Sequence, residues 1–217
     1  MREDLVPLLW QATRETLVMV GVAMAVTLPL GLLLGVLLLI TGPGQILQAT
    51  FAHRVLGAVV NVGRSVPFII LLVAVIPLTR ALVGTTIGTT AAIVPLAIGT
   101  IPFFARIVET ALREVPGGLV EAALAAGARR REVVTKVLIP EALPSLVAGV
   151  TITTIGVLGY SAMAGAVGGG GLGDVAIRYG YQRYETEVTI ATVVVLVALV
   201  QLLQFAGDRL ARHLSHS

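Results

Sequence analysis

The feature that most constrains this chain is an uninterrupted apolar run from Leu17 to Ile40, which contains no charged residue. An α-helix of that length measures about 36 Å, which exceeds the roughly 30 Å core of a bilayer. A secretory signal has an apolar core of only about 7–15 residues, so the run predicts a retained membrane anchor. Of the 217 residues, 56% are hydrophobic and 12% are charged, whereas a soluble domain carries about 25% charged residues. The chain is therefore expected to be an integral membrane protein.

Four further apolar runs follow, separated by turn-forming or charged residues. We expect an all-α polytopic membrane protein with one transmembrane domain over residues 1–217 and its core at about 13–206. The absence of cysteine excludes disulfides, thiol catalysis and cysteine-ligated zinc. The five predicted spans are residues 17–40, 55–77, 87–104, 143–163 and 188–206.

The basic residues give the predicted orientation. Five spans place the termini on opposite sides, and cytoplasmic loops carry the excess of Lys and Arg. The chain holds 15 Lys and Arg residues. The side with fewer of them carries Arg2, Arg14, Arg80, Arg178 and Arg183. The richer side carries Arg54, Arg64, Arg106, Arg113, Arg129, Arg130, Arg131, Lys136, Arg209 and Arg212. We therefore predict an external N-terminus, a cytoplasmic C-terminus and a cytoplasmic segment between the third and fourth spans.

The predicted spans lack groups that would couple transport to an energy source. Their interiors contain no Asp, Glu, Lys or His, and Arg64 lies near an end. Ion-driven transporters usually place ionisable side chains at membrane depth. No GxxxxGK[ST] phosphate loop is present, and the single lysine, Lys136, follows Thr135. Uphill transport by this chain would therefore take its energy from a partner.

The long cytoplasmic segment is the candidate contact for that partner. Pro116 and the two glycines after it are expected to break the preceding helix, and Gly127 suits a left-handed C-terminal cap. The short helix expected between them consists of small residues and one carboxylate, Glu121. Such a helix can enter a narrow groove and pair with a basic group there. Alternatively, it rests on the bilayer surface.

The segment from Glu121 to Pro140 resembles the EAA motif of ABC importer permeases. Glu-Ala-Ala, three residues, Gly127, nine residues and an aliphatic-x-aliphatic-Pro element recur at the family's spacing, with Val137 for the usual Ile and Ile139 for the usual Leu. The resemblance implies the ABC type-1 transmembrane fold, with residues 116–140 as a coupling segment docked on an ATPase. The docking residues it implies are Leu119, Glu121, Ala122, Ala123, Ala126 and Gly127.

Other stretches are similar to the methionine-importer branch of that family. They are residues 64–72, 139–144, 159–163, 168–173 and 204–208. The resemblance implies an amino-acid permease, with methionine as substrate, in a bacterial inner membrane. It implies a non-catalytic homodimer that meets two ATP-binding subunits, an extracytoplasmic binding protein and membrane lipid, but no nucleic acid. ATP and Mg²⁺ would be bound by the partner, and this chain would hold no cofactor. The alternatives are a permease for another small polar substrate, a carrier or channel not powered by ATP, and a structural membrane protein.

Two glycine patterns have competing interpretations. Residues 168–173 satisfy GxGxxG, but no strand–helix context of a dinucleotide site surrounds them. A flexible connector, re-entrant or external and able to face a docked binding protein, is the preferred interpretation. Gly31 and Gly35 form a GxxxG face in the first span. Close packing within the chain is the default interpretation, and a dimer seam is the alternative.

A cluster at the external end of the fourth span is the candidate substrate gate. It consists of Tyr160, Ser161 and Met163, which either pack conventionally or line the pathway, and a polarisable Met suits a gate that seals without tight binding. The three histidines, His53, His213 and His216, lack metal-ligand spacing, so no metal site is expected. Arg129–Arg131 are interpreted as a solvated face or a contact with anionic lipid.

Overall fold

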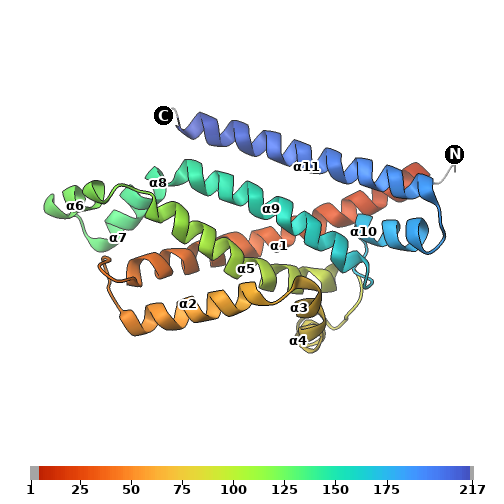
Figure 1. The fold of residues 1–217 in the computed structure, drawn as a ribbon, viewed down its shortest axis with the longest axis horizontal. Coiled ribbons are helices and arrows are strands. Elements are labelled where there is room, and N and C mark those ends of the chain that lie inside the picture. The colour runs from red at the N-terminus through yellow and green to blue at the C-terminus, as the bar shows by residue number, and fades with distance from the viewer. Residues whose placement is uncertain (1–4, 216–217) are drawn as a thin grey trace. The chain divides into compact units, whose positions relative to one another are not determined.

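The computed structural model describes residues 5–215, and His216 lies outside this range. The described residues form helices joined by turns and short irregular segments, and no strand occurs among them. Four of these helices are long and apolar enough to cross a membrane. They are α1 (Leu5–Thr41), α5 (Thr89–Arg113), α9 (Leu143–Gly165) and α11 (Thr186–Ser215), which Figure 1 labels. Only 11% of the apolar stretch of α11 is buried, so its outward side chains remain available for lipid.

The second apolar run is broken rather than straight. Helix α2 (Thr50–Ser65) ends just before helix α3 (Phe68–Ala74) begins, and together they make a fifth span if they are counted as one. Pro67 has no N–H to donate and disfavours helical geometry at Val66, which places the break here. Helix α4 (Ile76–Val83) follows, and Gly84 caps it with φ +77°. The predicted all-α membrane fold is thus confirmed.

Shorter elements connect the long helices. They are α6 (Gly117–Ala125), α7 (Arg130–Val133), the π-helical turn η1 (Val134–Leu138), α8 (Ile139–Glu141), α10 (Gly171–Val175) and the π-helical turn η2 (Ala176–Tyr181). Pro140 provides a reason for η1, because its ring removes one backbone donor from the helical ladder just after the turn.

The chain divides into two compact units, each with its own buried cluster. One unit contains the chain up to Thr27, Val66–Thr100 and Thr154–Gln204. Its cluster includes Ala12, Leu172, Val175 and Val188. The other contains Leu28–Ser65, Ile101–Thr153 and the chain from Phe205. Its larger cluster includes Leu39, Phe104, Val108, Leu112, Val133, Leu138 and Leu146.

The GxxxG face of α1 packs within the chain. A Cβ atom on Gly31 would lie 2.7 Å from Cδ1 of Phe104, and one on Gly35 would lie 2.6 Å from the Ala105 carbonyl oxygen. Both distances are shorter than a carbon contact of about 3.5–4.0 Å. The glycines therefore allow α1 and α5 to approach closely, as the default interpretation of the sequence expected.

Candidate functional site

The candidate coupling helix, α6, has well-defined ends. Pro116 is its N-cap, and the two glycines form its first turn. At the other end Gly127 has φ +85°. The Ala128 N–H donates to the Ala123 carbonyl at 3.0 Å, and the Gly127 N–H donates to the Leu124 carbonyl at 3.0 Å. This pair of bonds is a Schellman motif, so the predicted glycine cap is confirmed.

One detail of that prediction was wrong. Helix α5 ends at Arg113, three residues before Pro116. The two glycines do not break α5 but begin α6. A proline N-cap followed by glycine is tolerated here because the first backbone N–H groups of a helix have no intrahelical acceptor to lose.

The predicted docking residues lie mostly on the outside of α6. No residue of this helix is buried, and the Leu119 side chain is 42% exposed. Glu121, Ala122, Ala126 and Gly127 are also exposed. Ala123 differs, because it packs against the core cluster of its unit. The helix thus presents an apolar and acidic surface while Ala123 holds it to the fold.

Glu121 also lines a cavity of about 460 Å³ beside α6. Gln45, from the connection after α1, and Arg113, from the end of α5, line the same cavity. A carboxylate with a guanidinium in the same wall is suited to recognising a polar segment of a partner.

The segment packed against α6, formed by α7 and η1, is stabilised by the carboxylate of Glu132. Helix α6 contacts α7 and η1. Glu132 Oε2 accepts a bond of 2.9 Å from the Arg129 N–H, and its Oε1 accepts one of 3.0 Å from Lys136 Nζ. The backbone bond from Arg129 and then the bond and charge of Lys136 lower the pKa of Glu132 below its ordinary value. Arg129–Arg131 are exposed, as expected for a solvated face.

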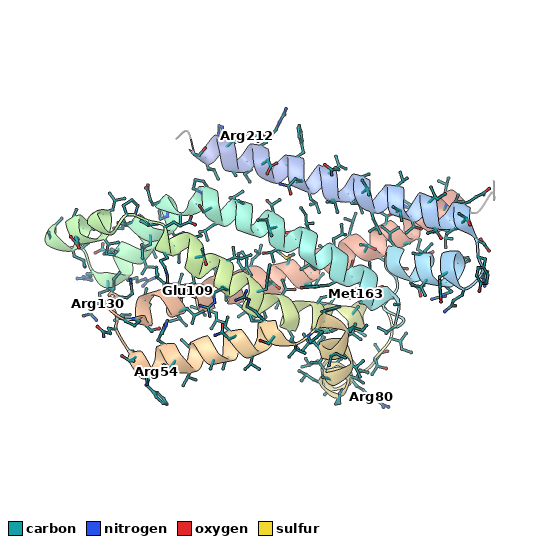
Figure 2. All side chains as sticks on the ribbon, viewed as in Figure 1. Arg54, Arg80, Glu109, Arg130, Met163 and Arg212 are labelled. Carbon is teal, nitrogen blue, oxygen red and sulfur yellow. The ribbon has the colours of Figure 1, made fainter. Side chains whose placement is uncertain are left out.

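A buried carboxylate on α5 was missed by the sequence analysis. Glu109 is 2% exposed, and its two oxygens accept bonds from Arg106 at 2.5 Å and Arg113 at 2.6 Å. Asn61 accepts a second bond of 2.6 Å from Arg106. Figure 2 shows Glu109 on α5. Glu109 lies three residues after Arg106 and four before Arg113, a spacing that is typical of paired charges on a helix. This pattern could have extended the predicted third span beyond Phe104.

The three predicted gate residues have different surroundings. Tyr160 stacks on Phe68, the first residue after the α2–α3 break, with ring centroids 4.6 Å apart and planes at 12°. Ser161 is buried, and its hydroxyl donates to the Leu158 carbonyl of its own helix at 2.7 Å. Met163 is 45% exposed. Met163 is therefore exposed and Tyr160 contacts the first residue of α3, whereas the Ser161 hydroxyl is buried and hydrogen-bonded within α9.

The glycine-rich block forms an ordered turn between α9 and α10. The Gly171 N–H donates to Glu15 at 2.8 Å, and the Leu172 N–H donates to Thr16 at 2.9 Å. The Gly88 N–H donates to the Gly168 carbonyl at 2.8 Å. Donors that a phosphate would need are occupied by α1, and neither flank is a strand. A dinucleotide does not fit this arrangement.

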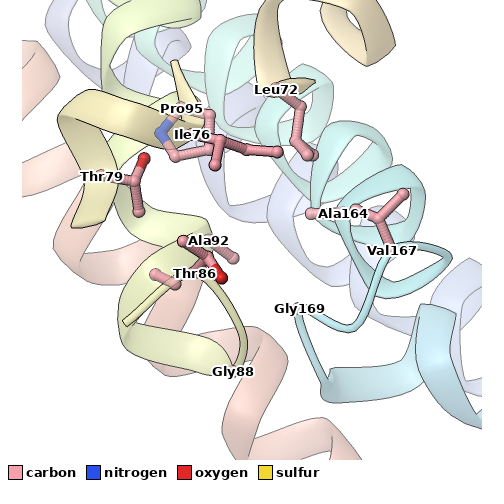
Figure 3. A pocket seen from close by; sticks show the side chains of 11 residues that line it. Leu72, Ile76, Thr79, Thr86, Gly88, Ala92, Pro95, Ala164, Val167 and Gly169 are labelled. Atoms are coloured by element: carbon pink, nitrogen blue, oxygen red, sulfur yellow. The ribbon is translucent and has the colours of Figure 1, made fainter. Parts of the chain in front are cut away.

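The cavity beside this turn is too small for a substrate (Figure 3). Its volume is about 20 Å³, and its lining includes Thr79, Gly88, Ala164 and Gly169. A single water molecule fills about 10–15 Å³ of such a cavity, so an amino acid does not fit. In the described part of the chain, no group of three acidic or His residues is placed to hold a metal ion. His53 instead places Nδ1 3.0 Å from the Leu38 carbonyl at the end of α1.

A family model for the binding-protein-dependent transport system inner membrane component matches residues 28–217. The chain belongs to this family. The permease is 57% identical to the probable D-methionine transport system permease protein MetI of Vibrio cholerae, over 96% of this chain and 93% of the relative. It is 53% identical to the D-methionine transport system permease protein MetI of Escherichia coli K12, over 73% of this chain and 75% of the relative.

Solved structures share the fold of the permease. A chain of the MetNI methionine ABC transporter in an inward facing conformation matches 99% of both chains, at 52% identity and a TM-score of 0.97. A chain of an amino acid ABC transporter solved with histidines matches at 20% identity and a TM-score of 0.79, which shows a common fold alone. The predicted family and its type of transmembrane fold are confirmed. The permease is a non-catalytic transport subunit.

Proposed function

We propose that this permease forms the methionine pathway of an ATP-driven importer. The observation that carries the proposal is the exposed α6 helix, held by its Schellman cap and by the Glu132 contacts. The relatives named as D-methionine permeases support methionine as the substrate. Another small polar substrate is the alternative that competition experiments address.

Helix α6 is the coupling helix. Leu119, Ala122 and Ala126 enter a cleft on a separate ATPase subunit, and Glu121 pairs with a basic group at its edge. ATP and Mg²⁺ are bound by that subunit. Closure of the ATPase subunits moves α6, and α6 transmits the movement through its contacts with α7 and η1.

The complete importer contains two copies of the permease. Four or five spans per copy are too few to enclose a pathway, and two copies supply two docking helices for two ATPase subunits. A binding protein delivers the substrate on the extracytoplasmic side, in keeping with the family's description as binding-protein-dependent. The N-terminus lies outside the bacterial inner membrane and the C-terminus lies in the cytoplasm, as the distribution of basic residues favours.

Tyr160 and Met163 form the gate at the external end of the pathway, and Ser161 supports their helix from within. The stack on Phe68 couples Tyr160 to the α2–α3 break. A movement of the break can therefore displace the gate.

Co-purification with a methionine-import ATPase tests the docking step. The Glu121→Lys variant is expected to lose ATPase binding and methionine uptake at normal membrane expression. Glu141→Lys is the matched control, because Glu141 is exposed in the same segment but lies outside α6. Equal retention of the ATPase by both variants would remove Glu121 from the dock, and no retention by the unmodified chain would overturn the proposal.

A further inference from the structure

A second polar cavity lies in the unit that carries the coupling helix. Its volume is about 400 Å³, within the roughly 300–1,000 Å³ range of small-molecule sites. The end of α2, the second half of α5 and the first half of α9 supply its walls. It differs from the small cavity at the glycine turn in combining charges of both signs with an apolar wall.

One side of the cavity is basic. Arg106 lines it with a side chain that is 29% exposed, although two of its N–H groups are engaged by Glu109 and Asn61. A guanidinium carries five N–H donors, so others remain for a ligand. Glu109 carries one negative charge and has two arginine partners, Arg106 and Arg113, so these three residues together keep a net positive charge. Arg64 adds another, and no ion pair of Arg64 occurs among residues 5–215.

The opposite charge comes from Glu114, the residue that follows the end of α5. Its Oε2 accepts a bond of 3.3 Å from the Ser145 hydroxyl of α9, and both residues line the cavity. Within the described chain, no ion pair is formed by Glu114. One neutral hydroxyl does not balance a carboxylate, which leaves it able to accept an ammonium group.

The rest of the wall is apolar. Phe103, Ile107 and Ile152 line the cavity, and the Ile152 side chain is 56% exposed. An unbranched aliphatic or thioether side chain would be removed from water against these residues.

We infer that this cavity is a transit site for a zwitterionic α-amino acid with an apolar side chain. Arg64 and Arg106 receive the carboxylate, Glu114 receives the ammonium group, and the apolar wall receives the side chain. The inference rests on the proposed function and adds a place where the permease itself contacts its substrate.

The cysteine-free sequence allows a direct test with single-cysteine variants of the permease bound to its ATPase. Ala148→Cys places a thiol in the cavity wall, and Gln48→Cys places one at an exposed position outside it. Millimolar methionine or norleucine is expected to slow alkylation several-fold at the first position and not at the second. N-acetylmethionine, which lacks the ammonium group, and methioninamide, which lacks the carboxylate, are expected to give no protection.

Charge variants in the Ala148→Cys background complete the test. Glu114→Gln is expected to abolish protection, whereas Arg54→Gln, an exposed arginine of α2 outside the cavity, is expected to preserve it. The inference is overturned by equal protection with N-acetylmethionine, by protection that persists in Glu114→Gln, or by protection from phosphatidylethanolamine in nanodiscs without any from methionine.

Methionine uptake by proteoliposomes with the binding protein separates the two proposals. Uptake without protection overturns the transit site alone, and absent uptake by the unmodified chain overturns the proposed function.

Discussion

Replacing Gly35 tests the close approach of α1 and α5. A Cβ atom there would lie 2.6 Å from the Ala105 carbonyl oxygen and 2.6 Å from Cβ of Val108. An ordinary contact requires about 3.5–4.0 Å, so Gly35→Ala must separate the two helices by roughly 1 Å. The backbone oxygen cannot rotate away as a side chain can. Overpacking of this kind costs about 1–3 kcal/mol.

Gly21→Ala is the matched control, because it adds the same atom to the same helix with nothing within 4 Å of it. The gain in helix propensity, about 1 kcal/mol, is common to both variants and cancels in their comparison. Gly31→Ala should be intermediate, since its close neighbour is the Phe104 ring, which can shift.

Thermal unfolding of the detergent-solubilised permease measures the difference. A cost of about 1–3 kcal/mol corresponds to a Tm lower by roughly 2–12 °C for Gly35→Ala than for Gly21→Ala, by the scaling for chains of this size. Equal Tm values for the two variants would refute the close helix contact.

Three further outcomes follow from described contacts and can be measured on the same preparation. Glu109→Gln should lower stability by about 1–3 kcal/mol, because Arg106 loses a charged acceptor in a largely buried position; an unchanged Tm would contradict this. Thr16→Val should cost about 1–3 kcal/mol, since it leaves the buried Leu172 N–H without its acceptor. The lowered pKa of Glu132 stabilises the N-terminus of α7 fully above the ordinary carboxyl pKa of about 4.3, and this contribution is lost as pH falls through the lowered folded value. The protection of the α7 amides from hydrogen exchange, measured against the intrinsic exchange rate at each pH, should therefore fall in acid, and Glu132→Gln should remove that dependence.

The sequence predicts features that depend on neighbours along the chain. Gly127 predicts the C-terminal cap of α6, because a glycine after a run of helix formers commonly adopts the left-handed conformation that ends a helix. The spacing of Gly31 and Gly35 predicts a close helix contact for the same local reason. The apolar runs predict membrane helices because bilayer thickness sets their length.

The features that could not be predicted from the sequence depend on contacts between residues that are far apart in the chain. The second span was predicted as one continuous run over residues 55–77, and the break at Val66 and Pro67 was not predicted. Glu109 falls in the segment that was predicted to be polar and cytoplasmic, and its burial was not predicted because it depends on packing rather than on its neighbours' hydropathy. The cavity formed by Arg64, Glu114 and Ser145 joins three helices, and no local pattern in the sequence brings them together.

The hydrogen bonds from the glycine turn to α1 constrain how the protein is made. Glu15 and Gly171, the first pair, are 156 residues apart in the chain. Translation at about 5–20 residues per second separates their synthesis by roughly 8–30 s. For most of that interval the first helix lies outside the ribosome while its Glu15 carboxylate and Thr16 hydroxyl have no glycine turn to bind. Apart from the 3.0 Å bond that Glu15 accepts from Gln11 within α1, insertion machinery or water must solvate these groups until the last quarter of the chain arrives, so α1 can reach its final position only late in biogenesis.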